Sequence, residues 1–202
     1  MLDVLEVYER AYDPKRPVVC IDEKSFQLLA SKRRSLAPSP GKAKREDYEY
    51  TRQGTANAFV AIEPLAGQRH VRITRKRRAL DFGAFIRFIV MEKYVSADKV
   101  IIVSDNLNIH CAKSLVETFG QAEAERILAR IEWHYTPKHA SWLSMAEIEI
   151  NVLTRQCLNQ RLGTREQAAR QVRAWQRRRN LAKKTICWKF TQAKAKQVFR
   201  LG

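Results

Sequence analysis

The chain has 202 residues, 45% of them hydrophobic, and its 38 Lys and Arg against 21 Asp and Glu give a formal net charge of +17. This composition supplies one main core and favours a polyanionic partner, most commonly nucleic acid, although a ribosome-like structural role, an anionic membrane surface or an acidic protein would fit the same charge. No apolar run reaches the roughly 20 residues that cross a bilayer, and the N-terminal residues lack a signal-peptide pattern, so we expect a cytoplasmic protein.

The first half of the chain predicts a strand, a basic loop and an antiparallel meander. Residues 17–21 form a short β-branched run that stops at Asp22, as a buried strand would. Residues 31–47 are rich in Pro, Ser, Gly and cations and predict an exposed loop. Strand-like runs follow at residues 48–52, 55–63 and 69–74, separated by turn residues at 54 and 65–67.

The second half alternates helices and strands. Helices are expected at residues 79–94, 115–130, about 144–160 and 164–180, and strands at 99–104, which stops at Asp105, and 131–135. This order predicts an α/β, ribonuclease H-like fold with a five-stranded mixed sheet flanked by helices. The expected organisation is a linker or short helix over residues 1–16, a catalytic domain over 17–162, and over 163–202 a C-terminal helical extension packed on the core or continuous with it.

Three acidic residues are candidates for chemistry. Asp22 and Asp105 follow predicted strands and would meet at the carboxyl edge of the sheet if those strands are neighbours. Glu147, from the helix after the fifth strand, would add a third carboxylate, and three such groups repel unless a cation lies among them. Hard oxygen donors favour Mg²⁺ or Mn²⁺ over zinc, and two such ions suit in-line displacement at phosphorus, so phosphodiester cleavage is the expected reaction.

Each of these residues has a structural alternative. Asp22 alone could simply form a turn. Residues 144–147 fit a capping box, in which case Glu149 is the substitute ligand. Glu23 should point away from Asp22 and act structurally or support the site. His110 could orient substrate or a carboxylate, but a core or solvent-facing histidine fits equally, and it stays outside the predicted catalytic set.

Cysteine, tryptophan and basic residues give weaker signals. The four cysteines form no C-x-x-C pair and are expected to be reduced; a zinc site would have to combine His110, Cys111, His134 and His139 without standard spacing. Of the four tryptophans, Trp142 is the candidate for stacking on a base, although a core position is the commoner role. The basic runs at residues 75–78 and 177–179 could be solvated faces; their number supports DNA contact.

Four segments carry a family resemblance. They are VVCIDEKSFQLL (18–29), DYEYTRQGTANAFVAIEPLAG (47–67), VIIVSDNLNIH (100–110) and HYTPKHASWLSMAEIEI (134–150). With the signatures D-N-x-x-x-H and P-x-x-x-S-W-L-x-x-x-E in this order, the chain resembles the DDE transposases of the mariner superfamily, in particular its bacterial insertion-sequence branch. The resemblance implies a catalytic, metal-binding triad of Asp22, Asp105 and Glu147, two Mg²⁺ or Mn²⁺ ions, cleavage at transposon ends, and joining to target DNA, typically at TA.

The sequence also departs from that family. Ser144 stands where relatives usually carry Asn, and the interval between Asp105 and Glu147 is longer than in animal mariner-type members. Relatives carry N-terminal helix-turn-helix domains, whereas about 16 residues precede the first predicted strand, so a separate helix-turn-helix protein is one expected partner. The resemblance implies a homodimer on DNA, associated with a bacterial nucleoid and not with a membrane. Alternatives are a catalytically silent DNA-binding remnant and another nuclease of the same architecture, such as a ribonuclease H or a junction resolvase.

Overall fold

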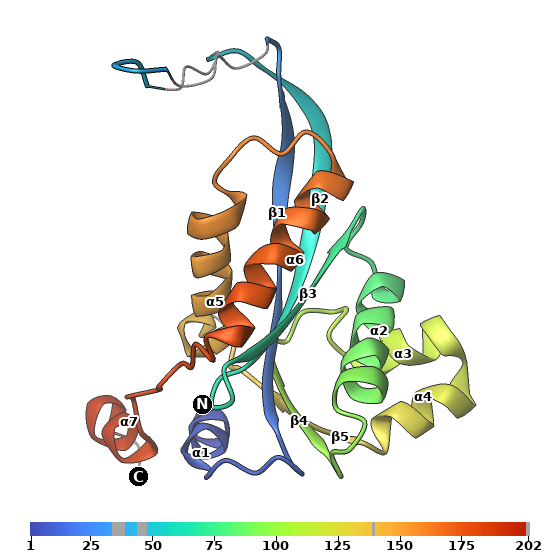
Figure 1. Ribbon diagram of the computed structural model, residues 1–202. Helices are drawn as coiled ribbons and strands as arrows, with labels where there is room; N and C mark the ends of the chain where they lie inside the picture. The colour runs from blue at the N-terminus through green and yellow to red at the C-terminus, as the bar shows by residue number, and fades with distance from the viewer. Residues whose placement is uncertain (34–38, 44–47, 139, 201–202) are drawn as a thin grey trace.

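The computed structural model describes residues 1–33, 39–43, 48–138 and 140–200 (Figure 1). Its strands are β1 (Val18–Ser31), β2 (Tyr50–Glu63), β3 (Gln68–Thr74), β4 (Val100–Ser104) and β5 (Ile131–Tyr135). Its helices are α1 (Leu2–Glu9), α2 (Ala79–Phe88), α3 (Ala112–Phe119), α4 (Gln121–Leu128), α5 (Met145–Leu153), α6 (Arg165–Leu181) and α7 (Gln192–Phe199). Short helical turns are η1 (Ile89–Lys93), η2 (Ser141–Leu143) and η3 (Thr154–Leu158). None of the helices in these ranges is long and apolar enough to cross a bilayer.

The five strands form one mixed sheet in the order β3-β2-β1-β4-β5. Strand β1 pairs antiparallel with β2, β2 antiparallel with β3, and β4 runs parallel to both β1 and β5. A tight turn joins β2 to β3, and helices α3 and α4 join the parallel strands β4 and β5, as connection rules require. The predicted α/β fold, a five-stranded mixed sheet flanked by helices, is confirmed.

Helices cover both faces of the sheet, because alternate residues of a strand point to opposite sides. On β2, Phe59 and Ala61 belong to the core that α2, α3 and α4 close, whereas Ala58 and Val60 pack with residues of α5 and α6. Figure 1 shows the two helical layers on either side of the strands. Asp22 therefore lies in a sheet that is fixed from both faces.

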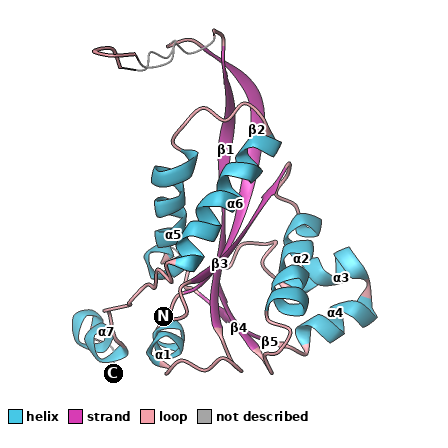
Figure 2. Ribbon diagram, in the orientation of Figure 1, coloured by secondary structure: helices cyan, strands magenta, loops and turns pink. Residues whose placement is uncertain are grey.

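The first two strands are longer than the sequence predicts. Strand β1 continues through Asp22 to Ser31, so this acid lies within a strand and not at its end. Strand β2 is continuous across Gly54, whose φ of +95° is accessible to glycine, so the two predicted runs at residues 48–52 and 55–63 are one element. Figure 2 shows β1 and β2 extending as a two-stranded ribbon past β4 and β5. Residues 34–38 and 44–47 of the predicted loop lie outside the described residues.

The single helix predicted over residues 115–130 is two helices. Gly120 ends α3 and begins α4 with φ +78° and ψ 171°, a conformation that is almost restricted to glycine. The apolar residues Leu115, Ala124 and Ile127 still enter one core. The periodic pattern therefore indicated burial correctly but missed the break.

The terminal helices pack on the sheet and on each other. Val4 and Val7 of α1 share a cluster with sheet residues such as Cys20 and Ile101, so this short helix packs against the sheet. Ala195 of α7 is buried in a cluster with residues of α1 and η2.

Candidate active site

The three predicted acids line one cavity. This acidic cavity, of about 370 Å³, is bounded by Asp22, Glu23, Lys24, Arg77, Asp105, Leu107, Glu147, Ile150 and Asn151. Four separate segments of the chain supply these residues. The sheet edge thus brings together side chains that are remote in sequence, as the connectivity predicted.

Strand register explains why Asp22 and Asp105 are neighbours. The parallel ladder between β1 and β4 pairs Cys20 with Val103, and extending the same register by two residues sets Asp22 beside Asp105. Strand β4 ends at Ser104, so Asp105 lies just beyond the sheet, while Asp22 remains paired with Val60 of β2. One acid is held by a strand and the other by the turn that follows a strand.

Glu147 lies in the first turn of α5. Ser144 is the N-cap residue, but its side chain makes no capping hydrogen bond, and its N–H donates to the carbonyl of Ser141 at 2.8 Å. The capping-box alternative for Glu147 is therefore not what the structure shows. Its side chain borders the acidic cavity instead.

Glu149, the substitute ligand, lies elsewhere. Its side chain is fully buried, with Oε1 at 2.9 Å from Arg69 Nε and 2.8 Å from Arg179 Nε, and Oε2 at 3.1 Å from a second nitrogen of Arg179. Both oxygens are engaged in ion pairs away from the cavity lining. Glu149 therefore ties α5 to β3 and α6 and does not border the site.

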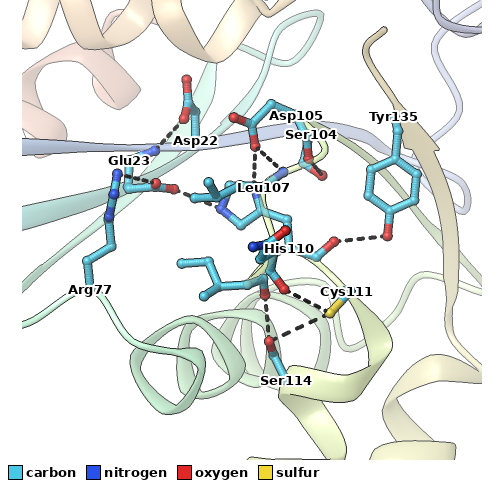
Figure 3. A network of polar contacts seen from close by, with 12 residues as sticks. Asp22, Glu23, Arg77, Ser104, Asp105, Leu107, His110, Cys111, Ser114 and Tyr135 are labelled. Carbon is cyan, nitrogen blue, oxygen red and sulfur yellow. Dashed lines mark hydrogen bonds and ion pairs between the residues drawn. The ribbon is translucent and has the colours of Figure 1, made fainter. Parts of the chain in front are cut away.

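His110 is the site residue that the sequence prediction left out. Its buried ring bridges two acids: Nδ1 is 2.5 Å from Asp105 Oδ1, and Nε2 is 2.8 Å from Glu23 Oε2 (Figure 3). Arg77 then donates to the other Glu23 oxygen at 3.0 Å. The histidine of the D-N-x-x-x-H motif was the available signal, but its partner Glu23 is 87 positions away.

The clustered charges shift the pKa values of these groups. Burial, together with the negative charges of Glu23 and Asp105, raises the pKa of Asp22 to about 7, although the Glu23 N–H donates to its carboxylate. The hydrogen bond from His110 lowers the pKa of Asp105. Burial disfavours charged His110, but the hydrogen bonds to Asp105 and Glu23 outweigh it and raise the pKa of this imidazole to about 9. The cavity thus concentrates negative charge that an added cation would balance.

The donor set has the chemistry of a hard-cation site. The lining offers carboxylate oxygens and no thiol, and the neighbouring imidazole of His110 is engaged on both nitrogens. Such oxygens fit Mg²⁺ or Mn²⁺. Within the described ranges, no three His, Cys, Asp or Glu side chains already converge closely enough to hold an ion.

The alternative zinc site does not form from the residues that can be placed. His134 contacts Asp3 and Glu132, whereas His110 contacts Glu23 and Asp105. His139 lies outside the described residues. Cys111 donates to the carbonyl of Asn108, and all four cysteines are free thiols.

A basic groove lies along strands β1 and β2, beyond the acidic cavity. It has a volume of about 540 Å³ and is lined by Leu28, Gln53, Gly54, Thr55, Arg75, Lys76 and Arg165. Arg75 and Lys76 directly precede Arg77, which borders the acidic cavity. Within the described chain, no carboxylate is paired with Arg75 or Lys76, so their charges face solvent.

The Trp142 side chain is partly exposed and partly packed against other aromatic rings. Its side chain is 47% exposed, and its ring packs edge-on against Phe190 at 5.5 Å and also contacts the ring of Phe199 at 6.4 Å between centroids. Trp175 is buried and donates to Gln156. The turn η2, which carries Trp142 and precedes Glu147, therefore packs against helix α7.

The chain is similar to known proteins in sequence and in structure. The sequence matches the family described as DDE superfamily endonuclease over residues 17–168. Among solved structures, the chain is similar to the Mos1 mariner paired end complex with Mn, with 14% identity, a TM-score of 0.34, and coverage of 93% of this chain and 61% of that chain. It is also similar to the Mos1 strand transfer complex, with 14% identity, a TM-score of 0.36, and coverage of 93% and 60%. The chain thus spans about 60% of the length of these solved chains. No curated protein matches it.

Proposed function

The chain belongs to the DDE superfamily of endonucleases, and from this premise we propose that it is the catalytic domain of a cut-and-paste DNA transposase. The observation that supports this most is the meeting of Asp22, Asp105 and Glu147 around one cavity. Acids on a strand, after a neighbouring strand and on a following helix are arranged to act on one phosphodiester bond. Membership of the bacterial insertion-sequence branch of the mariner superfamily is part of the proposal and is supported by the four resembling segments.

We assign the three acids to metal binding. Asp22 and Asp105 would carry most of the binding of two Mg²⁺ or Mn²⁺ ions, and Glu147 would complete the coordination of one. Divalent ions held there would stabilise the charge that develops during in-line displacement at phosphorus. Because α5 begins at Met145, its first turn is placed to bring Glu147 toward the two aspartates. Burial and the neighbouring carboxylates disfavour the charged form of Asp22 and raise its pKa, and a bound cation would compensate this charge.

DNA would reach the acids along the basic groove. Arg75, Lys76 and Arg165 offer positive charges in this groove, and Arg75 and Lys76 directly precede Arg77 of the acidic cavity. Each phosphate that such a side chain neutralises releases condensed counterions, which supplies sequence-independent affinity. We propose that these residues position the DNA backbone while the acids act on the scissile bond. Cleavage at transposon ends, joining to target DNA at TA and action as a homodimer complete the proposal and rest on the family resemblance.

A second candidate is a DNA-binding protein without turnover. The observation in its favour is that the carboxylates in the described part of the chain do not already converge on a point. In the enzyme, ion binding must draw them together. In a silent remnant, they never act.

A plasmid-nicking assay separates the two candidates. Supercoiled plasmid is incubated with the protein and Mg²⁺ or Mn²⁺, beside Asp22→Asn, Asp105→Asn and Glu147→Gln. Asp98→Asn is the matched control, because Asp98 is 73% exposed and far from the cavity. We expect nicking by the wild type and the control and none by the three site variants. If the wild type binds DNA with steep salt dependence but never cuts it, the binding protein is the correct assignment.

A further inference from the structure

A chain of four side chains leads from the surface to Asp105. Arg77 donates to Glu23 at 3.0 Å, Glu23 accepts from His110 at 2.8 Å, and His110 contacts Asp105 at 2.5 Å. Figure 3 shows these residues in sequence around the histidine ring. The chain links β1, the segment before α2, and the turn after β4. Three elements that are independent in sequence thus converge on one carboxylate.

The imidazole in the middle of this chain is firmly held. His110 has no exposed surface, and its ring lies against Phe82 with 4.5 Å between centroids. Its backbone is fixed as well, because its N–H donates to the Leu107 carbonyl at 2.8 Å and its carbonyl accepts from the Tyr135 hydroxyl at 2.9 Å. A ring held at its face and its backbone sets the direction of its two nitrogen donors.

The two carboxylate oxygens of Asp105 differ in their hydrogen bonds. Oδ1 accepts from His110 and from the Leu107 N–H at 3.3 Å. In the described residues, no hydrogen bond reaches Oδ2, and Figure 3 shows this oxygen turned toward Asp22. The side chain is 43% exposed, so the unengaged oxygen is accessible to a ligand. One oxygen is therefore anchored and the other is presented to the cavity.

Glu23 has no such unengaged oxygen. Its side chain is 3% exposed, one oxygen accepts from His110, and the other pairs with Arg77. Although Glu23 borders the cavity and follows Asp22 directly, both of its oxygens have partners. It is placed to support the histidine, not to bind an ion.

We propose that His110, backed by Glu23 and Arg77, is a positioning residue that fixes the Asp105 carboxylate so that Oδ2 is directed at a divalent cation. This inference rests on the proposed function, because it needs a cation at the acidic cavity. Partners that orient the ligands of a metal typically change its affinity by about 10- to 100-fold when they are removed.

Two amide substitutions of His110 separate positioning from simple packing. The amide nitrogen of Asn occupies about the place of His Nδ1 and can still donate to Asp105. The amide nitrogen of Gln occupies about the place of Nε2 and can reach Glu23 instead. Both changes remove the ring from Phe82, so both should lower stability to a similar extent. Only His110→Gln should lose the contact that orients Asp105.

The measurement is the dissociation constant of Mn²⁺, obtained by calorimetry or by the electron paramagnetic resonance of free Mn²⁺, with urea unfolding for each protein. We expect His110→Gln to bind Mn²⁺ roughly 10- to 100-fold more weakly than wild type, and His110→Asn to restore most of the affinity. Glu23→Gln should weaken binding less than His110→Gln and serves as the second probe if His110→Gln fails to fold. His134→Gln is the matched control, because His134 also contacts two carboxylates, Asp3 and Glu132, neither of which borders the cavity.

The outcomes are distinct. Equal Mn²⁺ affinity in wild type, His110→Gln and Glu23→Gln would overturn the positioning role while leaving the proposed metal site intact. Equal loss in the Asn and Gln variants would reduce His110 to a packing residue. A wild type that binds no Mn²⁺ would overturn both the inference and the metal-dependent function.

Discussion

Glu147 and Glu149 lie two residues apart on α5 and serve opposite sides of it: Glu147 borders the acidic cavity, while Glu149 is fully buried between Arg69 and Arg179. Residues two apart on a helix do not share a face. The same helix therefore carries a proposed ligand and an internal anchor. Glu149 fixes the helix to β3 and α6, and this contact also holds Glu147 in its place at the cavity.

Glu149→Gln should be strongly destabilising. Removing one partner of a buried ion pair leaves Arg69 charged and uncompensated, which typically costs about 3 to 5 kcal/mol. Urea unfolding measures this. Glu147→Gln is the control and should change stability by less than about 1 kcal/mol, since its side chain borders an open cavity. Equal effects of the two substitutions would contradict the division of roles on α5.

Acid should weaken the fold through His70. Burial lowers the pKa of His70 to about 4, below its ordinary value of 6.5, and the nearby charges of Lys93 and Arg69 act in the same direction. Because the folded state binds this proton less readily than the unfolded state, the contribution of neutral His70 is present above pH 6.5 and is lost as pH falls toward 4. The loss is on the order of 3 kcal/mol.

His70→Gln isolates this contribution. The difference in unfolding free energy between wild type and variant should shrink as pH falls from 6.5 to 4, whatever other groups titrate. Urea unfolding at several pH values gives the difference curve. A difference that is constant across this interval would show that His70 does not titrate abnormally.

Gly67 should not tolerate alanine. Its φ is +64°, and an added Cβ would lie 2.6 Å from the Lys183 carbonyl carbon and 2.8 Å from its oxygen. Left-handed backbone costs a residue with a side chain roughly 1 to 2 kcal/mol, and the contact with backbone adds to it. Gly41→Ala is the matched control, because Gly41 has φ +75° with no atom within 4 Å. Thermal unfolding should show a larger loss for Gly67→Ala, and similar losses would contradict a close approach of the chain after α6.

Substitutions in the basic groove should change the salt dependence of DNA binding. Arg75→Ala and Lys76→Ala should each make the negative slope of log affinity against log salt shallower by about one, since each removes one phosphate contact. Fluorescence anisotropy with duplex DNA at several salt concentrations measures the slope. Arg126→Ala is the control, because Arg126 pairs with Glu123 on α4 and lies outside the groove. Equal slopes in all four proteins would place the DNA elsewhere.

Local sequence patterns predicted the order of elements and the meeting of three acids. Apolar strands that stop at Asp22 and Asp105 indicated a shared sheet edge, because parallel neighbours end together. The ends of the strands were harder to predict. Strand β1 continues past Asp22 because β2 keeps pairing with it from Asp22 to Ser31, a partnership that the apolar pattern of β1 does not contain.

The sequence did not predict the roles of side chains whose partners are distant along the chain. Glu147 and Glu149 are both plausible ligands in the primary structure, and only the burial of Arg69 against Glu149 distinguishes them. His110 looked equally like a core or a surface residue, because its two carboxylate partners come from the turn it belongs to and from β1. Only the contacts of the folded chain identify the roles of these side chains.

The two aspartates differ in how freely they can adjust when something enters between them. Asp22 is paired with Val60 in the β1–β2 ladder, so its backbone cannot shift without breaking sheet hydrogen bonds. Asp105 lies beyond the last ladder pair of β4, where Ser104 is opposite Tyr135. Any induced fit in the cavity should therefore come from Asp105, whose position depends on its contacts with His110 and the Leu107 N–H and not on sheet pairing, against a stationary first aspartate.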